Sequence, residues 1–173
     1  LKRSAGRGDP ARKNGRILSS AVLLKAGLSH ANSDEEAVPN QLKRMLCQRD
    51  GAMIALLAVL PMRRRAFCEL RLSQSIQINA AEIIISLSED MTKTGVQWEA
   101  IVPPQAEPVL RRYIEDVRPF LIARGHLTHN VLWVGKKGQI IGQIYIGTRI
   151  GTLTKNLTGQ RVPPHFFRDA AAT

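Results

Sequence analysis

Four basic side chains in this 173-residue sequence stand where they could act on an anion. Arg63 lies in the run PMRRR, Lys93 lies in MTKTG, and His165 and Arg168 form an HxxR pair within PHFFRDAAAT. A guanidinium stays protonated at ordinary pH and can donate paired hydrogen bonds to two oxygens of an oxyanion. A lysine or a histidine can in addition move a proton. Together these residue types suit a site that binds an oxyanion and transfers a proton.

Local patterns predict the helices that carry the arginines. Arg49–Leu60 is apolar on nearly every side, which predicts a buried helix. Pro61 ends that helix just before Arg63. Near the other end of the sequence, Pro163–Pro164 precedes a last helix that begins at about His165.

The lysine lies among predicted strands. Three β-branched runs, Ile76–Asn79, Glu82–Leu87 and Gln97–Val102, are typical of short strands. Thr94–Gly95 supplies a turn between the second run and the third, so we expect Lys93 at the tip of a hairpin.

The remaining segments complete the fold class. Helices are expected at Ile17–Leu28, closed near Gly27, at a second segment opened by a capping box at Ser33–Glu36, and at Met62–Leu70, Pro103–Arg124 and Ile141–Leu157. Helices, a small sheet and further helices follow one another along the chain. This order predicts an α+β domain, mainly helical, with a small three-stranded antiparallel sheet.

Charge is spread unevenly along the chain. The net charge is +11, and residues 1–16 and residues 136–173 each carry six lysine or arginine side chains against one acidic side chain. Residues 76–102 carry four acidic side chains and Lys93 as their only cation. The basic surplus favours a polyanionic partner, nucleic acid before a membrane surface, and a basic surface without such a partner is the alternative. We expect residues 1–16 to be a flexible basic linker and residues 17–173 to be one domain.

The cysteines and the apolar runs exclude several classes of protein. Cys47 and Cys68 form neither a metal-ligand spacing nor a disulfide framework, which fits a reducing cytoplasm. The longest apolar run, Ala52–Met62, is too short to cross a bilayer. The chain begins at Leu1, and we expect it to be a piece of a longer protein.

The order of these motifs resembles the tyrosine recombinases of the phage-integrase type. The resemblance covers nearly the whole chain from about Ile17 and is strongest at Pro61–Leu72, Thr92–Gly95 and Pro164–Thr173. PHFFRDAAAT is close to the family's second arginine box, where HxxR opens a helix ending in Ala-Thr. The resemblance implies a catalytic domain for site-specific DNA recombination, which cleaves and rejoins strands through a 3′-phosphotyrosine intermediate without a metal or other cofactor.

The resemblance also implies a role for each of the four residues. Arg63 and Arg168 would clamp the non-bridging oxygens of the scissile phosphate, on which negative charge builds as a tyrosine attacks. Lys93 would donate a proton to the leaving 5′-oxygen. His165 would assist proton transfer from the attacking tyrosine.

Further contacts and partners are expected on the same basis. DNA contacts are expected at Arg64, Arg65, Thr92, Lys136 and Lys137. The expected partner is double-stranded DNA, with self-association on paired sites, as a tetramer in the full-length protein, and no membrane. The expected location is the bacterial cytoplasm, at the nucleoid.

Two features depart from the family pattern. The family often has an acidic residue three positions after its first arginine, where this sequence has Ala66, and Glu69 could substitute for it. The family's nucleophilic tyrosine follows the Ala-Thr, where this sequence ends. Tyr113 and Tyr145 do not occupy that place, and we interpret both as structural. Two alternatives stay open: a degenerate integrase that binds DNA without catalysis, and a type IB topoisomerase, which shares the chemistry.

Overall fold

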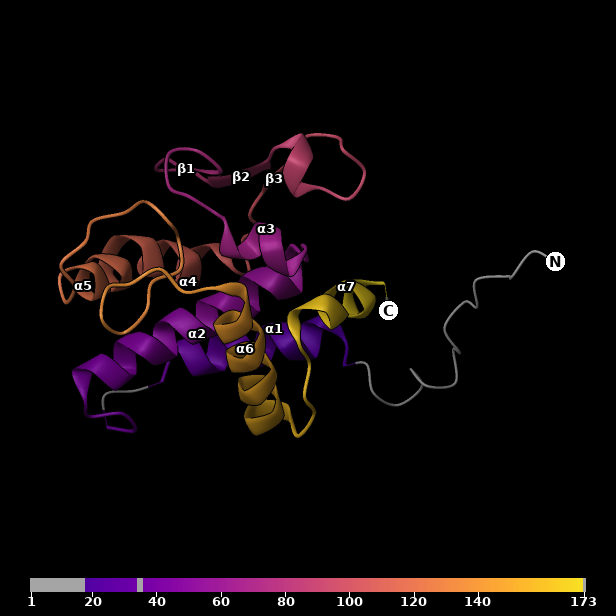
Figure 1. Ribbon diagram of the computed structural model, residues 1–173. Coiled ribbons are helices and arrows are strands. Elements are labelled where there is room, and N and C mark those ends of the chain that lie inside the picture. Colours follow the sequence, from indigo (N-terminus) through magenta and orange to yellow (C-terminus); the bar gives the residue numbers. More distant parts are fainter. Residues whose placement is uncertain (1–17, 34–35, 173) are drawn as a thin grey trace.

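The computed structural model describes residues 18–33 and 36–172, and Figure 1 shows a small sheet lying to one side of a group of helices. The elements in chain order are α1 (Ser20–Ala31), α2 (Gln41–Val59), α3 (Arg64–Cys68), β1 (Ile76–Ile78), β2 (Ile83–Leu87), the 3-10 turn η2 (Glu89–Met91), β3 (Trp98–Ile101), α4 (Glu107–Arg112), the π-helical segment η3 (Tyr113–Val117), α5 (Arg118–Ile122), α6 (Gln143–Thr158), the 3-10 turn η4 (Pro164–Phe166) and α7 (Phe167–Ala171). This is the predicted α+β architecture.

Helix α2 supplies the centre of the core. Arg49–Ala58 is buried without a break, which confirms the predicted buried helix. The helix begins after Asn40, whose side-chain oxygen accepts a hydrogen bond of 3.0 Å from the backbone nitrogen of Lys43. The predicted capping box at Ser33–Glu36 is therefore wrong, because Asn40 provides the cap directly before the first turn.

Helices α1 and α2 pack closely at two glycines. A β-carbon on Gly51 would lie 2.5 Å from the carbonyl oxygen of Gly27, and one on Gly27 would lie 2.8 Å from the backbone nitrogen of Ala55. The prediction that α1 closes near Gly27 is wrong, since the helix continues to Ala31. Glycine is required there by the close approach of the two backbones and not by a helix end.

The three strands form one antiparallel sheet in the order β1-β2-β3. Ile85 of β2 pairs with Ile76 on one side and with Ala100 on the other. Residues of β2 alternate between buried and half-buried, as expected for a sheet that packs one face on the core. The connection from β2 to antiparallel β3 contains η2, and Lys93 lies after that 3-10 turn, within the loop between the two strands where it was predicted.

The predicted long helix at residues 103–124 is one helix with a π-helical segment in its middle. Helices α4, η3 and α5 follow one another without a gap. Pro119 has no N–H to donate to the carbonyl four residues earlier, which accounts for the wider turn that precedes it. Tyr113 anchors this segment: its hydroxyl donates to Leu132 O at 2.6 Å and accepts from Val134 N at 3.1 Å.

Helices α6 and α7 complete the domain around α2. Helix α6 contacts α1, α2 and α3, and α7 contacts α1 and α2. Helix α6 ends at Gly159, which has a left-handed backbone with φ +81°. Trp133, whose ring centroid lies 5.0 Å from those of both Phe67 and Tyr113, joins the core beneath them.

Within the described residues, no helix combines the length and the apolar character needed to cross a membrane. The basic linker predicted at residues 1–16 lies outside the described residues.

Candidate active site and nucleic-acid interface

Arg63 lies at the junction of α2 and α3. It is the N-cap residue of α3, with an extended backbone (φ −65°, ψ 143°) that turns the chain out of the buried α2. Ala66 and Phe67, in the turn that follows, are fully buried and hold the start of α3 against the core. The Arg63 side chain is exposed, so a fixed backbone presents a solvent-facing guanidinium.

Lys93 is presented by a loop that Thr92 closes. The hydroxyl of Thr92 donates to the carbonyl oxygen of Val96 at 2.8 Å and accepts from the Val96 backbone nitrogen at 3.2 Å. These two bonds tie together the ends of the turn that holds Lys93, whose side chain is exposed. The Thr92 hydroxyl, predicted as a DNA contact, is thus engaged within the protein and shapes the loop.

His165 and Arg168 lie on the last described elements. His165 is in the 3-10 turn η4, with its ring centroid 4.3 Å from that of Phe166, and Arg168 is in α7. Phe167 and Ala170, on either side of Arg168 in sequence, are buried and fix α7 on the core. Both His165 and Arg168 point to solvent.

The packing of the helices links three of the four predicted residues. Arg63 follows directly from α2, α7 packs on α2, and η4 packs on α6, which in turn contacts α3. Lys93 comes from the sheet and is not part of this helical group. Across residues 18–33 and 36–172, the side chains of Arg63, Lys93 and Arg168 take part in no hydrogen bond or ion pair, and none of the four contacts another in this way.

Glu69 does not orient Arg63, although the sequence suggested that it could replace the missing acidic residue. Glu69 accepts a hydrogen bond of 3.0 Å from Nε of Arg65, one helical turn earlier. Both side chains of this ion pair are exposed to solvent. Arg65 therefore has a carboxylate partner, and Arg63 takes none from Glu69. The DNA contact expected at Arg65 stays a prediction.

A buried charged network lies beneath the site, and sequence reasoning did not single it out. Asp50 accepts from Nε and Nη2 of Arg49 at 2.9 and 2.7 Å through one oxygen, and from Arg149 through the other. Arg49 also donates to Val134 O and to the hydroxyl of Tyr145. Arg49 and Asp50 are each only 1% exposed. The sequence contained a sign of this network. Arg49 and Asp50 stand next to each other at the start of an apolar run, and charged side chains that are buried in such a helix need partners.

The two tyrosines of the chain are both engaged. Tyr113 is fully buried between the carbonyl of Leu132 and the nitrogen of Val134, and burial raises the pKa of its phenol. Tyr145 accepts a hydrogen bond from Arg49, whose guanidinium also lies 5.7 Å from the centre of its ring. These contacts fit the structural roles predicted for both residues.

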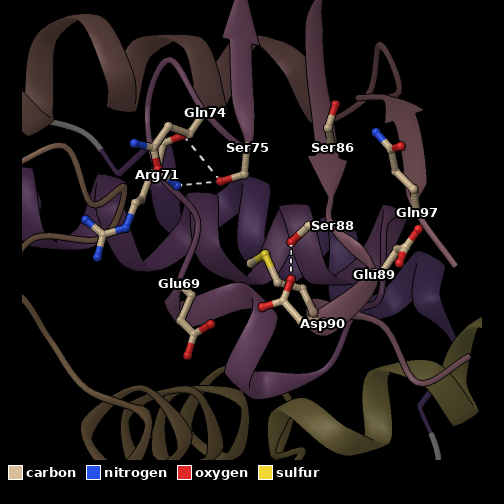
Figure 2. Close-up of a pocket in the computed structure, with 10 residues that line it drawn as sticks. Glu69, Arg71, Gln74, Ser75, Ser86, Ser88, Glu89, Asp90 and Gln97 are labelled. Carbon is tan, nitrogen blue, oxygen red and sulfur yellow. Dashed lines mark hydrogen bonds between the residues drawn. The ribbon is translucent and has the colours of Figure 1, made fainter. Parts of the chain in front are cut away.

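A polar hollow of about 600 Å³ opens between the end of α3 and the sheet (Figure 2). Its lining residues are Glu69, Arg71, Gln74, Ser75, Ser86, Ser88, Glu89, Asp90, Met91 and Gln97. Figure 2 shows the Arg71 guanidinium directed away from the carboxylates, and it donates to Asn130 at 2.9 Å. The acidic lining repels phosphate, so this hollow is not the phosphate site.

The predicted contacts Lys136 and Lys137 lie apart from the helical group. They are exposed in the turn between the bridged residues Val134 and Ile140, close to Arg124 after α5, which donates to the carbonyl oxygen of Lys136 at 3.0 Å. Figure 1 places α5 and α7 at opposite sides of the molecule. The basic stretch at residues 136–173 is therefore divided between separate surfaces. In the part of the chain that the structure describes, no three His, Cys, Asp or Glu side chains gather where they could hold a metal ion.

Two solved structures have a similar fold. One is the XerH site-specific recombinase bound to palindromic difH substrate in a post-cleavage complex, with 15% identity, a TM-score of 0.63, and 96% of this chain and 43% of that chain covered. The other is a pre-cleavage complex of XerH with difH, with 13% identity, a TM-score of 0.57, and 88% and 40% covered. No family model and no curated protein matches the sequence. The fold of this chain is similar to that of these two recombinase chains, and the chain spans less than half of their length.

Proposed function

We propose that this chain binds duplex DNA and holds a scissile phosphate for strand cleavage and rejoining in site-specific recombination. The observation that carries the proposal is the pair of exposed guanidiniums of Arg63 and Arg168, which have no partner among the described residues. Buried neighbours hold the backbone at each arginine, and α7, which carries Arg168, packs on α2, the helix that precedes Arg63. The fold resembles that of DNA-bound XerH complexes. Unneutralised guanidiniums on a fixed backbone suit a phosphoryl group whose charge increases during reaction.

In the proposed reaction, each basic residue acts on a different atom. Arg63 and Arg168 donate to the non-bridging oxygens as a tyrosine oxygen attacks phosphorus and the bond to the 5′-oxygen breaks. Lys93 gives its proton to that leaving oxygen, and the loop closed by Thr92 sets its position. His165 helps to take the proton from the tyrosine hydroxyl. The tyrosine comes from outside these 173 residues, because Tyr113 and Tyr145 are both engaged.

Salt-dependent binding to duplex DNA tests the proposal first. Each phosphate neutralised releases condensed counterions, so the logarithm of the affinity falls linearly with the logarithm of salt concentration. Fluorescence anisotropy with a labelled duplex should show this slope. Replacing Arg63 and Arg168 together with alanine should weaken binding and reduce the slope. Failure to bind duplex at low salt, or an affinity independent of salt, would overturn the proposal.

A second candidate is DNA binding without catalysis. Ala66 stands where the resemblance leads us to expect an acidic residue, and Glu69 is paired with Arg65. Arg63 therefore lacks the orienting carboxylate. A longer protein that contains this domain and a tyrosine nucleophile, binds its site tightly and never forms a covalent adduct would favour this candidate.

A further inference from the structure

Two arginines outside the four predicted catalytic residues lie against glycines of α6. Nη1 of Arg64 is 3.1 Å from the position that a β-carbon would take on Gly147. Cζ of Arg161 is 2.7 Å from the corresponding position on Gly151. Any other residue at these positions would meet the guanidiniums, so the glycines provide the space that the two side chains occupy.

The two glycines that the guanidiniums contact lie about one helical turn apart. Gly147 and Gly151 are four residues apart on α6, which places them on one face and about 6 Å apart along the axis. Arg64 comes from α3 and Arg161 from the segment after α6, so two distant parts of the chain bring like charges to the same helix face.

Neither charge is neutralised by the described residues. Arg64 takes part in no hydrogen bond or ion pair there, and Arg161 makes one long hydrogen bond, 3.4 Å from Nη1 to the hydroxyl of Thr152. Arg65 and Arg149, by contrast, each form an ion pair with a carboxylate, that of Glu69 and that of Asp50 respectively. Two neighbouring cations without a counterion create a local positive potential that attracts an anion.

We propose that Arg64 and Arg161 form a second phosphate site on α6, which binds one backbone phosphate of the DNA duplex. The site rests on the proposed function and extends it. A phosphodiester is the matching ligand because each guanidinium can donate two hydrogen bonds to its oxygens. Arg64 adjoins Arg63 in the chain, so the second phosphate would belong to the same stretch of duplex as the scissile one. Such a contact fixes the position of the duplex and reads no base.

The glycines allow a test that moves the arginines without removing charge. In Gly151→Ala the new β-carbon displaces the Arg161 guanidinium, and in Gly147→Ala it presses on that of Arg64. Gly142→Ala at the start of the same helix is the matched control, because a β-carbon there has nothing within 4 Å. Thermal unfolding of all three variants checks that the domain stays folded.

Duplex affinity is measured by anisotropy from about 50 to 200 mM salt. We expect Arg64→Ala and Arg161→Ala each to reduce the salt slope by about 0.9, the value for one phosphate. The double variant should lose no more than either single variant, because both residues hold the same phosphate. Gly151→Ala should lower affinity, and Gly142→Ala should not.

The outcomes separate this site from the proposed function. Wild-type protein that binds no duplex would overturn both. Wild-type protein that binds with the expected slope, weakened by alanine at Arg63 and Arg168 and unaffected by alanine at Arg64 and Arg161, would overturn the second site alone. Slope losses that add in the double variant would show two separate phosphates and would contradict a shared one. Because both side chains are exposed, the alanine variants decide the question even where a glycine variant unfolds.

Discussion

Asp50 and Arg149 join α2 to α6 through a single carboxylate oxygen. Nε of Arg149 lies 2.8 Å from Oδ2 of Asp50 and Nη2 lies 2.7 Å from it, while the other oxygen binds Arg49. Asp50 therefore balances two guanidiniums at once, one of them buried. The contact fixes the helix that precedes His165 against the helix that precedes Arg63.

Asp50→Asn should strongly destabilise the fold. The amide offers one acceptor and no charge, which leaves Arg49 as an uncompensated buried cation, and breaking a buried pair in this way costs about 3–5 kcal/mol. Urea unfolding measures the free energy of unfolding. Glu69→Gln, in the exposed pair with Arg65, is the control and should change it by less than about 1 kcal/mol. Equal effects of the two substitutions would contradict a structural role for the network.

Stability should fall as the pH is lowered because of His30. Burial lowers the pKa of His30 below its ordinary value; among smaller effects, Asp50 raises that pKa and Arg149 lowers it. Its Nε2 is buried without a hydrogen-bond partner among the described residues. Above the ordinary histidine pKa of about 6.5, His30 is neutral in both the folded and the unfolded protein, and its contribution to the free energy of unfolding is complete. Below it the unfolded state takes up a proton that the folded state resists, so stability is lost as the pH falls toward the folded pKa.

Urea unfolding at several pH values between about 5.5 and 7.5 tests this dependence, a range that spans the ordinary histidine pKa. The variant His30→Gln should show a shallower loss of stability toward low pH. An unchanged pH profile in that variant would assign the dependence to other groups.

Cys68 should resist alkylation in the native protein. Cys68 is 7% exposed, and burial raises the pKa of its thiol to about 12, so very little reactive thiolate is present near pH 8. Iodoacetamide labelling followed by mass spectrometry, in the variant Cys47→Ser, reports on Cys68 alone. We expect labelling only after denaturation. Rapid labelling of the native variant would show that the segment after Arg63 opens to solvent.

The proposed general acid can be tested through its leaving group. In a longer protein that joins this domain to its tyrosine, Lys93→Ala should slow formation of the covalent adduct with a nicked substrate. A 5′-thiol leaving group needs little protonation, so a bridging sulfur should restore the rate. Arg168→Ala should lose on the order of 10²–10³ in rate with either substrate, because it stabilises charge and moves no proton. Equal rescue of both variants would argue against the assigned roles.

Much of the fold follows from local pattern. The β-branched runs around residues 76–102 predicted the three strands, and the apolar run at Arg49–Leu60 predicted the buried helix, because burial imposes a repeat that short segments display. The start of α2 was missed, since Ser33 and Asn40 are equally good caps in isolation and the packing of α1 on α2 determines where the helix begins.

What the sequence determined by itself was the set of candidate cations and their order along the chain. Only the tertiary structure decided which of them remain available to a ligand. Within the described residues, Arg65 and Arg149 are paired with carboxylates, and Arg63, Arg64 and Arg168 are not. The physical reason is that the charge a guanidinium offers depends on the groups within hydrogen-bond distance. For Arg149 that group is Asp50, 99 residues away in sequence and brought near by the packing of α6 on α2.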